Sequence, residues 1–408
     1  MSSRQAARNA VLNLLDLTFL DERTMARPSS YGTAVSTVCD LKCPHCMRES
    51  LGIRENLFMD IDRLAEHREE LATARRVSLF GLGEPFLHPQ FFEIIAFCKS
   101  LGVYVTTSSH GMSLKPDVCE RILESGLDEV NVSMDGATRK TFNELRVGAD
   151  FDTVVERVTA LSDLKRARGV EKPRLNVNMT ILRRNLREVP RLVRLAKRMG
   201  VQSVSFSSVV AYKAEDIPQS ALDTPEFEAA LDEARRLADR HGIEMSFWRQ
   251  KPVGWAPAPH APGAPHGCVV LWSDQIIERD GLMKLCCYIE EDVADVFKDG
   301  PMGAFNGEEV LRQRRLLIDG RVRVECQGCL YLRERTPNWM QAVIDRAAHR
   351  NRTDPDLTDD DRRELDETIA TIQARKNALH PEHARRNGEA ESVNGARAAI
   401  VAPELPVY

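Results

Sequence analysis

Cysteines are the residues of this chain whose spacing could do chemistry. Seven of the ten cysteines fall into two spaced groups, Cys39, Cys43 and Cys46, then Cys268, Cys286, Cys326 and Cys329. Thiolates are soft ligands that suit iron–sulfur clusters or zinc. Three thiols on one loop would leave a cubane cluster with one iron free for another ligand, which a reactive centre needs. Four cysteine ligands would leave no iron of a cluster free to bind a substrate, which favours a role in electron transfer.

Each cysteine group also has a simpler interpretation. The first could be a zinc knuckle that borrows a fourth ligand, or three unrelated cysteines. The second could be a zinc site with four cysteine ligands, and Cys287 could replace Cys286 among them.

The first group follows the first of several expected strands. These strands are Thr33–Val38, Arg76–Phe80, Tyr104–Ser108, Glu129–Ser133, Leu175–Leu182, Val201–Ser207 and Ile243–Phe247. They are apolar or β-branched runs, typical of parallel strands buried on both faces. Amphipathic helices such as Pro190–Met199 lie between them. The alternation predicts an α/β domain with a parallel sheet, and such domains place their chemistry at the carboxyl ends of the strands.

The second half of the chain begins with an interruption. Residues 251–267 are rich in proline, and they are either a linker or a loop over the active site. Further on, helices are expected over Asn338–Arg350 and from Asp359 to about Leu379, the second capped by Thr358. Residues 383–400 are small and polar, which predicts a flexible tail.

The bulk composition argues against two classes of partner. With 408 residues and a formal charge of −5, the composition gives no indication of a basic face for nucleic acid or an anionic membrane. The apolar stretch Ala10–Leu17 is interrupted by Asn13 and Asp16, so it predicts an amphipathic helix and not a signal sequence. No run is long enough to span a membrane, and we expect a cytoplasmic protein.

Two motifs resemble those of a known superfamily. The run CDLKCPHC at residues 39–46 resembles the CxxxCxxC signature of the radical S-adenosylmethionine (SAM) superfamily. The resemblance implies that Cys39, Cys43 and Cys46 hold a catalytic [4Fe–4S] cluster whose open iron binds SAM. His45 stands where the family usually has an aromatic residue near the adenine.

The run GLGEP at residues 81–85 resembles the superfamily's GGEP motif, which binds the amino group of SAM. Gly81 and Gly83 would let the backbone approach a ligand, and the carboxylate of Glu84 suits a cationic amine.

The same resemblance extends to later strands. It implies that Ser133 and Arg146 bind the ribose or carboxylate of SAM, although a strand-end serine and a surface arginine would look the same. Asp135 is as easily a turn residue as a ligand. The resemblance covers residues 33–210 and implies a partial (β/α)6 barrel, similar to part of a TIM barrel.

The second cysteine group resembles the SPASM/twitch extension of auxiliary-cluster enzymes. Gly281 lies five places before Cys286, as in the family's Gly-x4-Cys hairpin, and Cys326 and Cys329 form a Cys-x2-Cys pair. This implies one auxiliary [4Fe–4S] cluster. The predicted organisation is a helical extension over 1–30, the barrel over 31–250, the auxiliary-cluster domain over 251–335, helices over 336–382 and a tail over 383–408.

The resemblance also implies a reaction. A 5′-deoxyadenosyl radical would abstract hydrogen from a substrate, with an external donor such as flavodoxin or ferredoxin. The cysteine spacing looks most like the twitch dehydrogenases of aminocyclitol antibiotic pathways, which implies oxidation of a sugar or cyclitol alcohol to a ketone. A SPASM-type peptide maturase and a non-catalytic iron–sulfur or zinc protein are the alternatives.

If residues 282–288 form a hairpin arm, Cys287 would face away from the cluster. It is then either a small buried hydrophobe or the hydrogen donor of a redox-neutral epimerase.

Overall fold

A mostly parallel sheet forms the centre of the molecule. The computed structural model describes residues 2–209, 219–222, 224–248, 263–286, 289–327, 329 and 331–383. In this part of the chain, one ten-stranded sheet has the order β11-β10-β9-β1-β2-β3-β4-β5-β6-β7, and a small second sheet pairs β8 with β12. The strands are β1 (Ser30–Ala34), β2 (Arg76–Phe80), β3 (Tyr104–Ser109), β4 (Glu129–Ser133), β5 (Arg174–Ile181), β6 (Ser203–Ser208), β7 (Glu244–Trp248), β8 (His266–Cys268), β9 (Asp274–Ile277), β10 (Leu282–Cys286), β11 (Ile289–Asp295) and β12 (Leu332–Glu334).

Strands β1 to β7 run parallel to one another in chain order. On the other side of β1, β9 adds a further parallel strand, and β10 and β11 extend the sheet as an antiparallel hairpin. The expected α/β class is therefore confirmed. The domain boundary predicted at residue 250 does not interrupt the sheet, because β9 pairs directly with β1.

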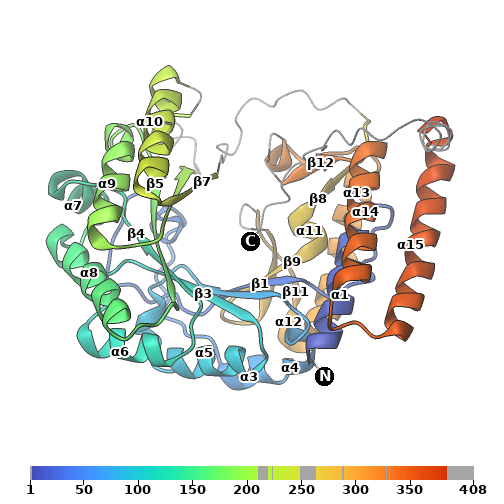
Figure 1. The fold of residues 1–408 in the computed structure, drawn as a ribbon, viewed down its shortest axis with the longest axis horizontal. Helices are drawn as coiled ribbons and strands as arrows, with labels where there is room; N and C mark the ends of the chain where they lie inside the picture. Colours follow the sequence, from blue (N-terminus) through green and yellow to red (C-terminus); the bar gives the residue numbers. More distant parts are fainter. Residues whose placement is uncertain are drawn as a thin grey trace.

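Helices surround the sheet. The helices of more than one turn and a half are α1 (Ser2–Asp16), α5 (Phe91–Ser100), α6 (Pro116–Glu124), α7 (Arg139–Leu145), α8 (Phe151–Ala167), α9 (Val189–Met199), α10 (Pro225–His241), α12 (Val296–Phe305), α13 (Glu308–Ile318), α14 (Pro337–Thr353) and α15 (Asp359–Leu379). Shorter helices are α2 (Met47–Ser50), α3 (Ile61–Ala65), α4 (Arg68–Leu71) and α11 (Val269–Ser273). Figure 1 shows α5 to α10 along the left and lower outside of the sheet, and α1 beside α14 and α15 on the right.

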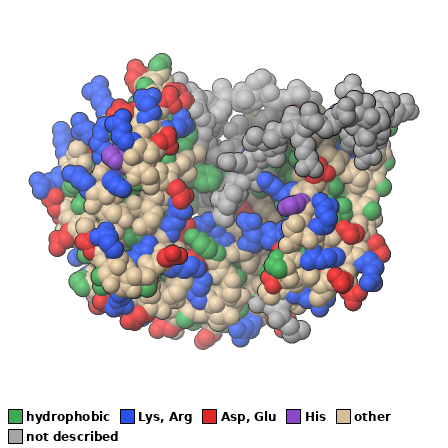
Figure 2. All heavy atoms as spheres, viewed as in Figure 1, with side chains coloured by type: hydrophobic (Ala, Val, Ile, Leu, Met, Phe, Trp, Pro, Cys, Tyr) green, Lys and Arg blue, Asp and Glu red, His purple; other side chains and the backbone are tan. Residues whose placement is uncertain are grey.

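The same view in space-filling form shows a hollow near the centre of this face (Figure 2). It lies between the half of the molecule that carries α8 to α10 and the half that carries α13 to α15, and basic side chains are visible at its floor.

Helix α9 shows how the sequence determines the outer layer. Its apolar residues, including Leu192, Leu195 and Met199, are buried against the sheet. Pro190 lies in the first turn, and Gly200 ends the helix in the left-handed conformation with φ of 72°. The predicted helix Pro190–Met199 is therefore confirmed.

The first strand differs from its prediction. It covers Ser30–Ala34 and not Thr33–Val38. The Val35 amide still donates to Phe80 O of β2 at 2.8 Å, but residues 36–38 leave the ladder and form hydrogen bonds with other segments. The Thr37 amide donates to Leu57 O at 3.0 Å, and Val38 O accepts from the Glu84 amide at 2.7 Å. The remaining predicted strands agree with the structure to within one or two residues at each end.

The expectation that the parallel strands are buried on both faces holds only for parts of the sheet, such as Val105–Thr107 of β3, where successive residues are buried. In β4, Val130 and Val132 are buried, whereas Asn131 and Ser133 are partly exposed on the other face. In the described part of the chain, α5 to α10 lie along the outside of the parallel strands (Figure 1), and polar side chains such as Asn131 and Ser133 lie on the inner face of β4. A ladder crosses this polar face from strand to strand: Asn176 Nδ2 donates to Asn131 Oδ1 at 2.8 Å and to Ser205 Oγ at 2.8 Å.

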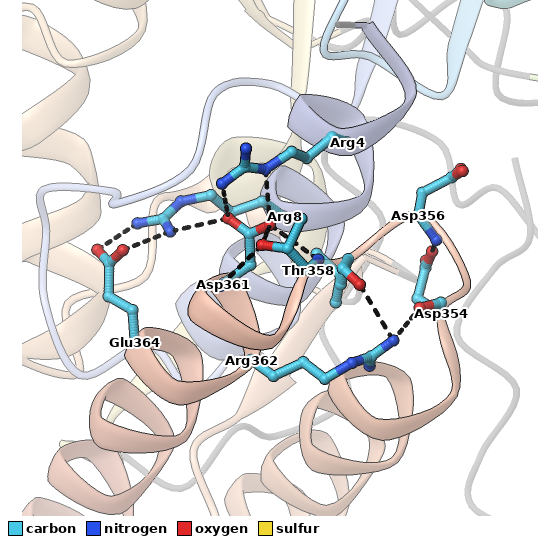
Figure 3. Close-up of polar contacts among 9 residues, drawn as sticks. Arg4, Arg8, Asp354, Asp356, Thr358, Asp361, Arg362 and Glu364 are labelled. Atoms are coloured by element: carbon cyan, nitrogen blue, oxygen red, sulfur yellow. Dashed lines mark hydrogen bonds and ion pairs between the residues drawn. The ribbon is translucent and has the colours of Figure 1, made fainter.

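The C-terminal helices fold back onto the N-terminal helix. Their apolar side chains form a core of their own, which includes Ala7, Val11, Leu15, Ile344, Ala347, Leu357, Leu365 and Ile372. At one end of this core, Arg4 Nε donates a hydrogen bond to Asp361 Oδ2 at 2.7 Å, and Arg8 Nη1 donates one to Glu364 Oε2 at 2.7 Å (Figure 3). Asp361 also closes a capping box with Thr358, as the sequence predicts for the start of α15.

Other predictions concern the chain ends and the linker. The amphipathic N-terminal helix and the helix predicted over Asn338–Arg350 are present as α1 and α14. Residues 251–262 of the proline-rich stretch and the tail from residue 384 lie outside the described residues. Among the described helices, none combines the length and apolar character needed to cross a bilayer.

Candidate functional site

A pocket lies at the carboxyl ends of the first four strands. It is lined by Cys39, Leu41, Cys43, Cys46, Arg48, Glu49, Phe80, Gly81, Leu82, Gly83, Glu84, Ser108, Ser109, His110, Ser133 and Arg146. All three thiols of the first cysteine group are in this set. So are all the predicted cofactor residues except His45. The sequence motifs, which are spread over more than a hundred residues, therefore meet at one place.

The thiols of the first group are partly or wholly buried. No disulfide links any of the nine described cysteines. Burial raises the pKa of the Cys39 and Cys43 thiols to about 11. Buried thiolates need a nearby cation, and a metal centre provides one. The donor set therefore fits an iron–sulfur cluster with three protein ligands.

The GLGEP turn is bound to the chain just before the cysteine loop. The Gly83 amide donates to Ser36 O at 2.9 Å, next to the bond between Glu84 and Val38. A Cβ atom on Gly83 would lie 2.3 Å from Val38 O, so no larger residue fits without moving backbone. The turn thus fixes the cysteine loop against the end of β2. This is a second reason for the glycines, besides the approach of a ligand.

Glu84 presents a buried carboxylate at the pocket. The residue is 2% exposed and accepts hydrogen bonds from Ser109 Oγ at 2.7 Å and the His110 amide at 2.9 Å. His110 Nε2 is 3.5 Å from Glu84 Oε2 but only 2.7 Å from Asp40 Oδ1. Burial raises the pKa of Glu84, which means that the carboxylate is short of positive charge. A cationic amine in the pocket would supply that charge.

Asp135 is a buried residue beside the pocket whose contacts the sequence did not reveal. It is completely buried, and its Oδ2 lies 2.6 Å from Arg146 Nε and 2.9 Å from His45 Nε2. Its Oδ1 accepts from the Thr180 amide at 2.8 Å. Burial would raise the pKa of Asp135, but Arg146 and His45 outweigh that effect and hold it well below its usual range. His45 is turned toward this carboxylate, and its role beside an adenine stays a prediction.

Arg146 connects Asp135 to the cysteine loop. Although burial alone would raise the pKa of Cys43, Arg146 acts in the opposite direction through its charge and a hydrogen bond. Cys46 also interacts electrostatically with Arg146. The structure therefore places a cation beside two thiols of the first group, and Asp135 orients it. Contact of Arg146 with the cofactor stays a prediction.

The second cysteine group also converges. Cys268 lies between β8 and α11, Cys286 ends β10, and Cys326 and Cys329 flank a short turn after α13. Burial raises the pKa of Cys268 well above its usual value, and the other three cysteines raise it further. The β10–β11 hairpin, predicted for residues 282–288, is present as Leu282–Cys286 and Ile289–Asp295. Cys287 lies outside the described residues.

The spacing of the thiols bears on which metal they fit. Zn–S bonds of about 2.3 Å in a tetrahedral site bring the sulfur atoms to about 3.8 Å from one another. In the described part of the chain, the group of three candidate ligands whose donor atoms all lie within 4.8 Å is Cys39, Asp40 and His110. Neither cysteine group forms such a set by itself.

Comparisons with known proteins agree with this site. Residues 33–196 match the family described as the Radical SAM superfamily. The matched part of the chain contains the CxxxCxxC loop, the GLGEP turn and Asp135.

Relatives and solved structures extend the similarity. The chain is 24% identical over 193 residues to the tungsten-containing aldehyde ferredoxin oxidoreductase cofactor-modifying protein of Pyrococcus furiosus (46% of this chain, 54% of the relative). It is 29% identical over 185 residues to the mycofactocin maturase MftC of Mycobacterium tuberculosis (44% of each). The match thus spans about half the length of these relatives.

Two solved structures share the fold. SuiB of Streptococcus suis bound to its precursor peptide SuiA gives a TM-score of 0.56 at 14% identity, over 75% of this chain and 72% of that one. His-tagged anSMEcpe with bound AdoMet gives 0.53 at 17% identity, over 79% of this chain and 96% of that one.

Proposed function

We propose that the chain is a radical SAM enzyme whose reaction takes place at the pocket lined by Cys39, Cys43 and Cys46. The observation that carries the proposal is the meeting of these thiols with Glu84 and Arg146 around one pocket. When bound there, a [4Fe–4S] cluster and SAM supply a 5′-deoxyadenosyl radical that removes a hydrogen atom from a substrate carbon.

The chain's own residues hold the reactants. Glu84 offers its buried carboxylate to the amine of SAM, and Ser133 offers a hydroxyl at the end of β4. Arg146 places positive charge beside Cys43 and Cys46, and Asp135 fixes its orientation. Because Asp135 satisfies both Arg146 and His45, the basic side chains around the cysteine loop are positioned before any ligand arrives.

The second cysteine group is proposed to hold an auxiliary [4Fe–4S] cluster. The convergence of Cys268, Cys286, Cys326 and Cys329 supports a shared metal centre, and the resemblance of their sequence spacing to the auxiliary-cluster extension favours a cluster over zinc. With four protein ligands its irons are closed to substrate, so its part is to carry an electron. An external donor such as flavodoxin or ferredoxin completes the electron supply.

The polar face of the sheet supports a substrate rich in hydrogen-bonding groups. Asn131, Asn176 and Ser205 form a ladder across it, and Asn178 Oδ1 is buried without a partner in the described structure. A TIM barrel of ordinary kind would fill this face with branched apolar side chains. We propose a sugar or cyclitol as the substrate and oxidation of one of its alcohols to a ketone.

Peptide maturation is the second candidate. It is favoured by the similarity to SuiB, solved with its precursor peptide, and to the mycofactocin maturase MftC. A peptide backbone would also bond to a face of asparagine and serine side chains.

The first experiment measures 5′-deoxyadenosine formed from SAM by anaerobically reconstituted enzyme with dithionite. Glu84→Gln keeps the shape but removes the charge, and SAM affinity should fall roughly 5- to 30-fold, or about 1–2 kcal/mol, with iron content unchanged. Glu93→Gln, an exposed change on α5, is the matched control. Unchanged affinity in Glu84→Gln would show that the GLGEP turn is only structural.

The second experiment measures the mass of the product. Loss of two hydrogens from a cyclitol or sugar supports the dehydrogenase, and a crosslinked peptide supports the maturase. A product that has the mass of the substrate in ordinary water but gains one deuterium in deuterated water, with the deuterium lost in Cys287→Ala, would establish the epimerase instead.

A further inference from the structure

Arg314 of α13 is a charged side chain in the interior of the C-terminal half. Its residue is 0% exposed. Its Nη1 donates to Glu22 O at 2.9 Å and to Asn306 Oδ1 at 2.8 Å, and its guanidinium carbon lies 4.4 Å from the centre of the Phe305 ring. Its Nη2 is buried without a hydrogen-bond partner. Among the described residues, no carboxylate lies within 4.0 Å to form an ion pair with it.

A guanidinium in such a place needs negative charge. Moving an ion out of water costs several kcal/mol unless an opposite charge compensates it. Accordingly, burial lowers the pKa of Arg314 to about 9. Asp16 acts on Arg314 from a distance, but its carboxylate already accepts hydrogen bonds from the amides of Met25 and Ala26. The described carboxylates alone therefore leave Arg314 poorly compensated.

Cys268, one member of the second cysteine group, lies near Arg314. Arg314 Nε donates to Leu271 O at 2.9 Å, and the amide of Leu271 donates to the sulfur of Cys268. As a thiolate, Cys268 would act directly on Arg314 as well. Helix α13 packs against β8, the strand that ends at Cys268, and Figure 1 shows both beside α11. One residue thus separates the buried guanidinium from a predicted cluster ligand.

We propose that Arg314 is a positioning residue of the auxiliary cluster, which raises the reduction potential of that cluster by placing a fixed positive charge beside Cys268. The inference rests on the proposed function, because it requires a [4Fe–4S] cluster at the four cysteines. Four thiolates give the cluster a net negative charge, and reduction adds one more unit. A nearby cation stabilises the reduced form more than the oxidised form. The cluster is thereby made a better electron acceptor, and the cluster charge in turn compensates Arg314.

The test measures the reduction potential by a dithionite titration followed by electron paramagnetic resonance. The background is a Cys39→Ala, Cys43→Ala, Cys46→Ala triple variant, so that the signal comes from the auxiliary cluster alone. Arg314→Met should lower the potential, whereas Arg314→Lys, which keeps the charge, should leave it near the parent value. The matched control is Arg315→Met, because Arg315 is on the same helix but its side chain is 59% exposed and paired with Glu22.

The outcomes separate the two proposals. Absence of iron and of a signal in the parent triple variant would refute the auxiliary cluster itself. A normal cluster whose potential is the same in Arg314→Met as in the parent would overturn the inference about Arg314. If the Arg314→Met variant does not bind iron, the reduction potential of the Asp16→Asn variant at pH 8 provides the deciding test. This substitution removes the carboxylate that opposes Arg314, so it should raise the potential, and an unchanged potential would again overturn the inference.

Discussion

Asp135 should stabilise the apo protein through its charge. In Asp135→Asn the side chain keeps its shape, but Arg146 loses its counterion while its side chain is only 15% exposed. Removing one partner of a buried ion pair typically costs about 3–5 kcal/mol, because the other charge stays buried without compensation. The bond from the Thr180 amide can persist, since an amide oxygen also accepts. We expect a loss of about that size in the free energy of unfolding.

Urea unfolding of the metal-free protein at pH 7 measures this loss without any contribution from cofactors. Asp152→Asn is the matched control, because Asp152 pairs with Arg139 on the surface and its loss should leave the midpoint unchanged. The double variant Asp135→Asn with Arg146→Gln removes both charges and should recover much of the stability. If Asp135→Asn behaved like the surface control, the reasoning about the buried pair would be refuted.

The pH dependence follows from the direction of the pKa shift. The pKa of Asp135 is lower in the folded protein than in the unfolded chain, where it is about 3.9. Its contribution is therefore fully present above the unfolded pKa and is lost as the pH falls below it. The stability difference between wild type and Asp135→Asn should be constant from about pH 6 to pH 8, and it should shrink below about pH 4.

Two further changes test the supports of the site and of the terminal helices. Gly83→Ala brings a methyl group against Val38 O and should loosen the cysteine loop. The amount of iron bound at Cys39, Cys43 and Cys46 should therefore fall. An unchanged iron content would contradict the close approach of Gly83 to Val38. Thr358→Ala removes the N-cap of α15 and should cost about 1 kcal/mol in urea unfolding, whereas the exposed Thr371→Ala on the same helix should cost little or nothing.

The sequence predicted most of the sheet because strand and helix periodicities are local. It misplaced the first strand, since Ser36, Thr37 and Val38 form hydrogen bonds with Leu57 and the GLGEP turn instead of extending the ladder. It also missed the polar face of the sheet. The alternation of Val130, Asn131 and Val132 indicates one buried face, but the prediction relied on the β-branched character of the runs alone.

The environments of Asp135 and Arg314 could not be predicted, because they depend on contacts between segments that lie far apart in the sequence. Asp135 followed by glycine has the local pattern of a turn, and only the fold brings His45 to it from 90 positions away. Arg314 occupies a helix of ordinary amphipathic pattern, and its burial results from contacts such as that with Glu22, 292 positions away. The cysteines were predictable because their spacing alone carries the signal.

The most direct test of the account is a metal analysis of anaerobically purified protein and of the Cys39→Ala, Cys43→Ala, Cys46→Ala triple variant. The wild type should contain about eight irons and almost no zinc, because two cubane clusters hold about four irons each. The triple variant should keep about half of that iron and lose all SAM cleavage. Stoichiometric zinc in the triple variant, or a loss of all its iron, would contradict the proposal that the chain holds one catalytic and one auxiliary cluster.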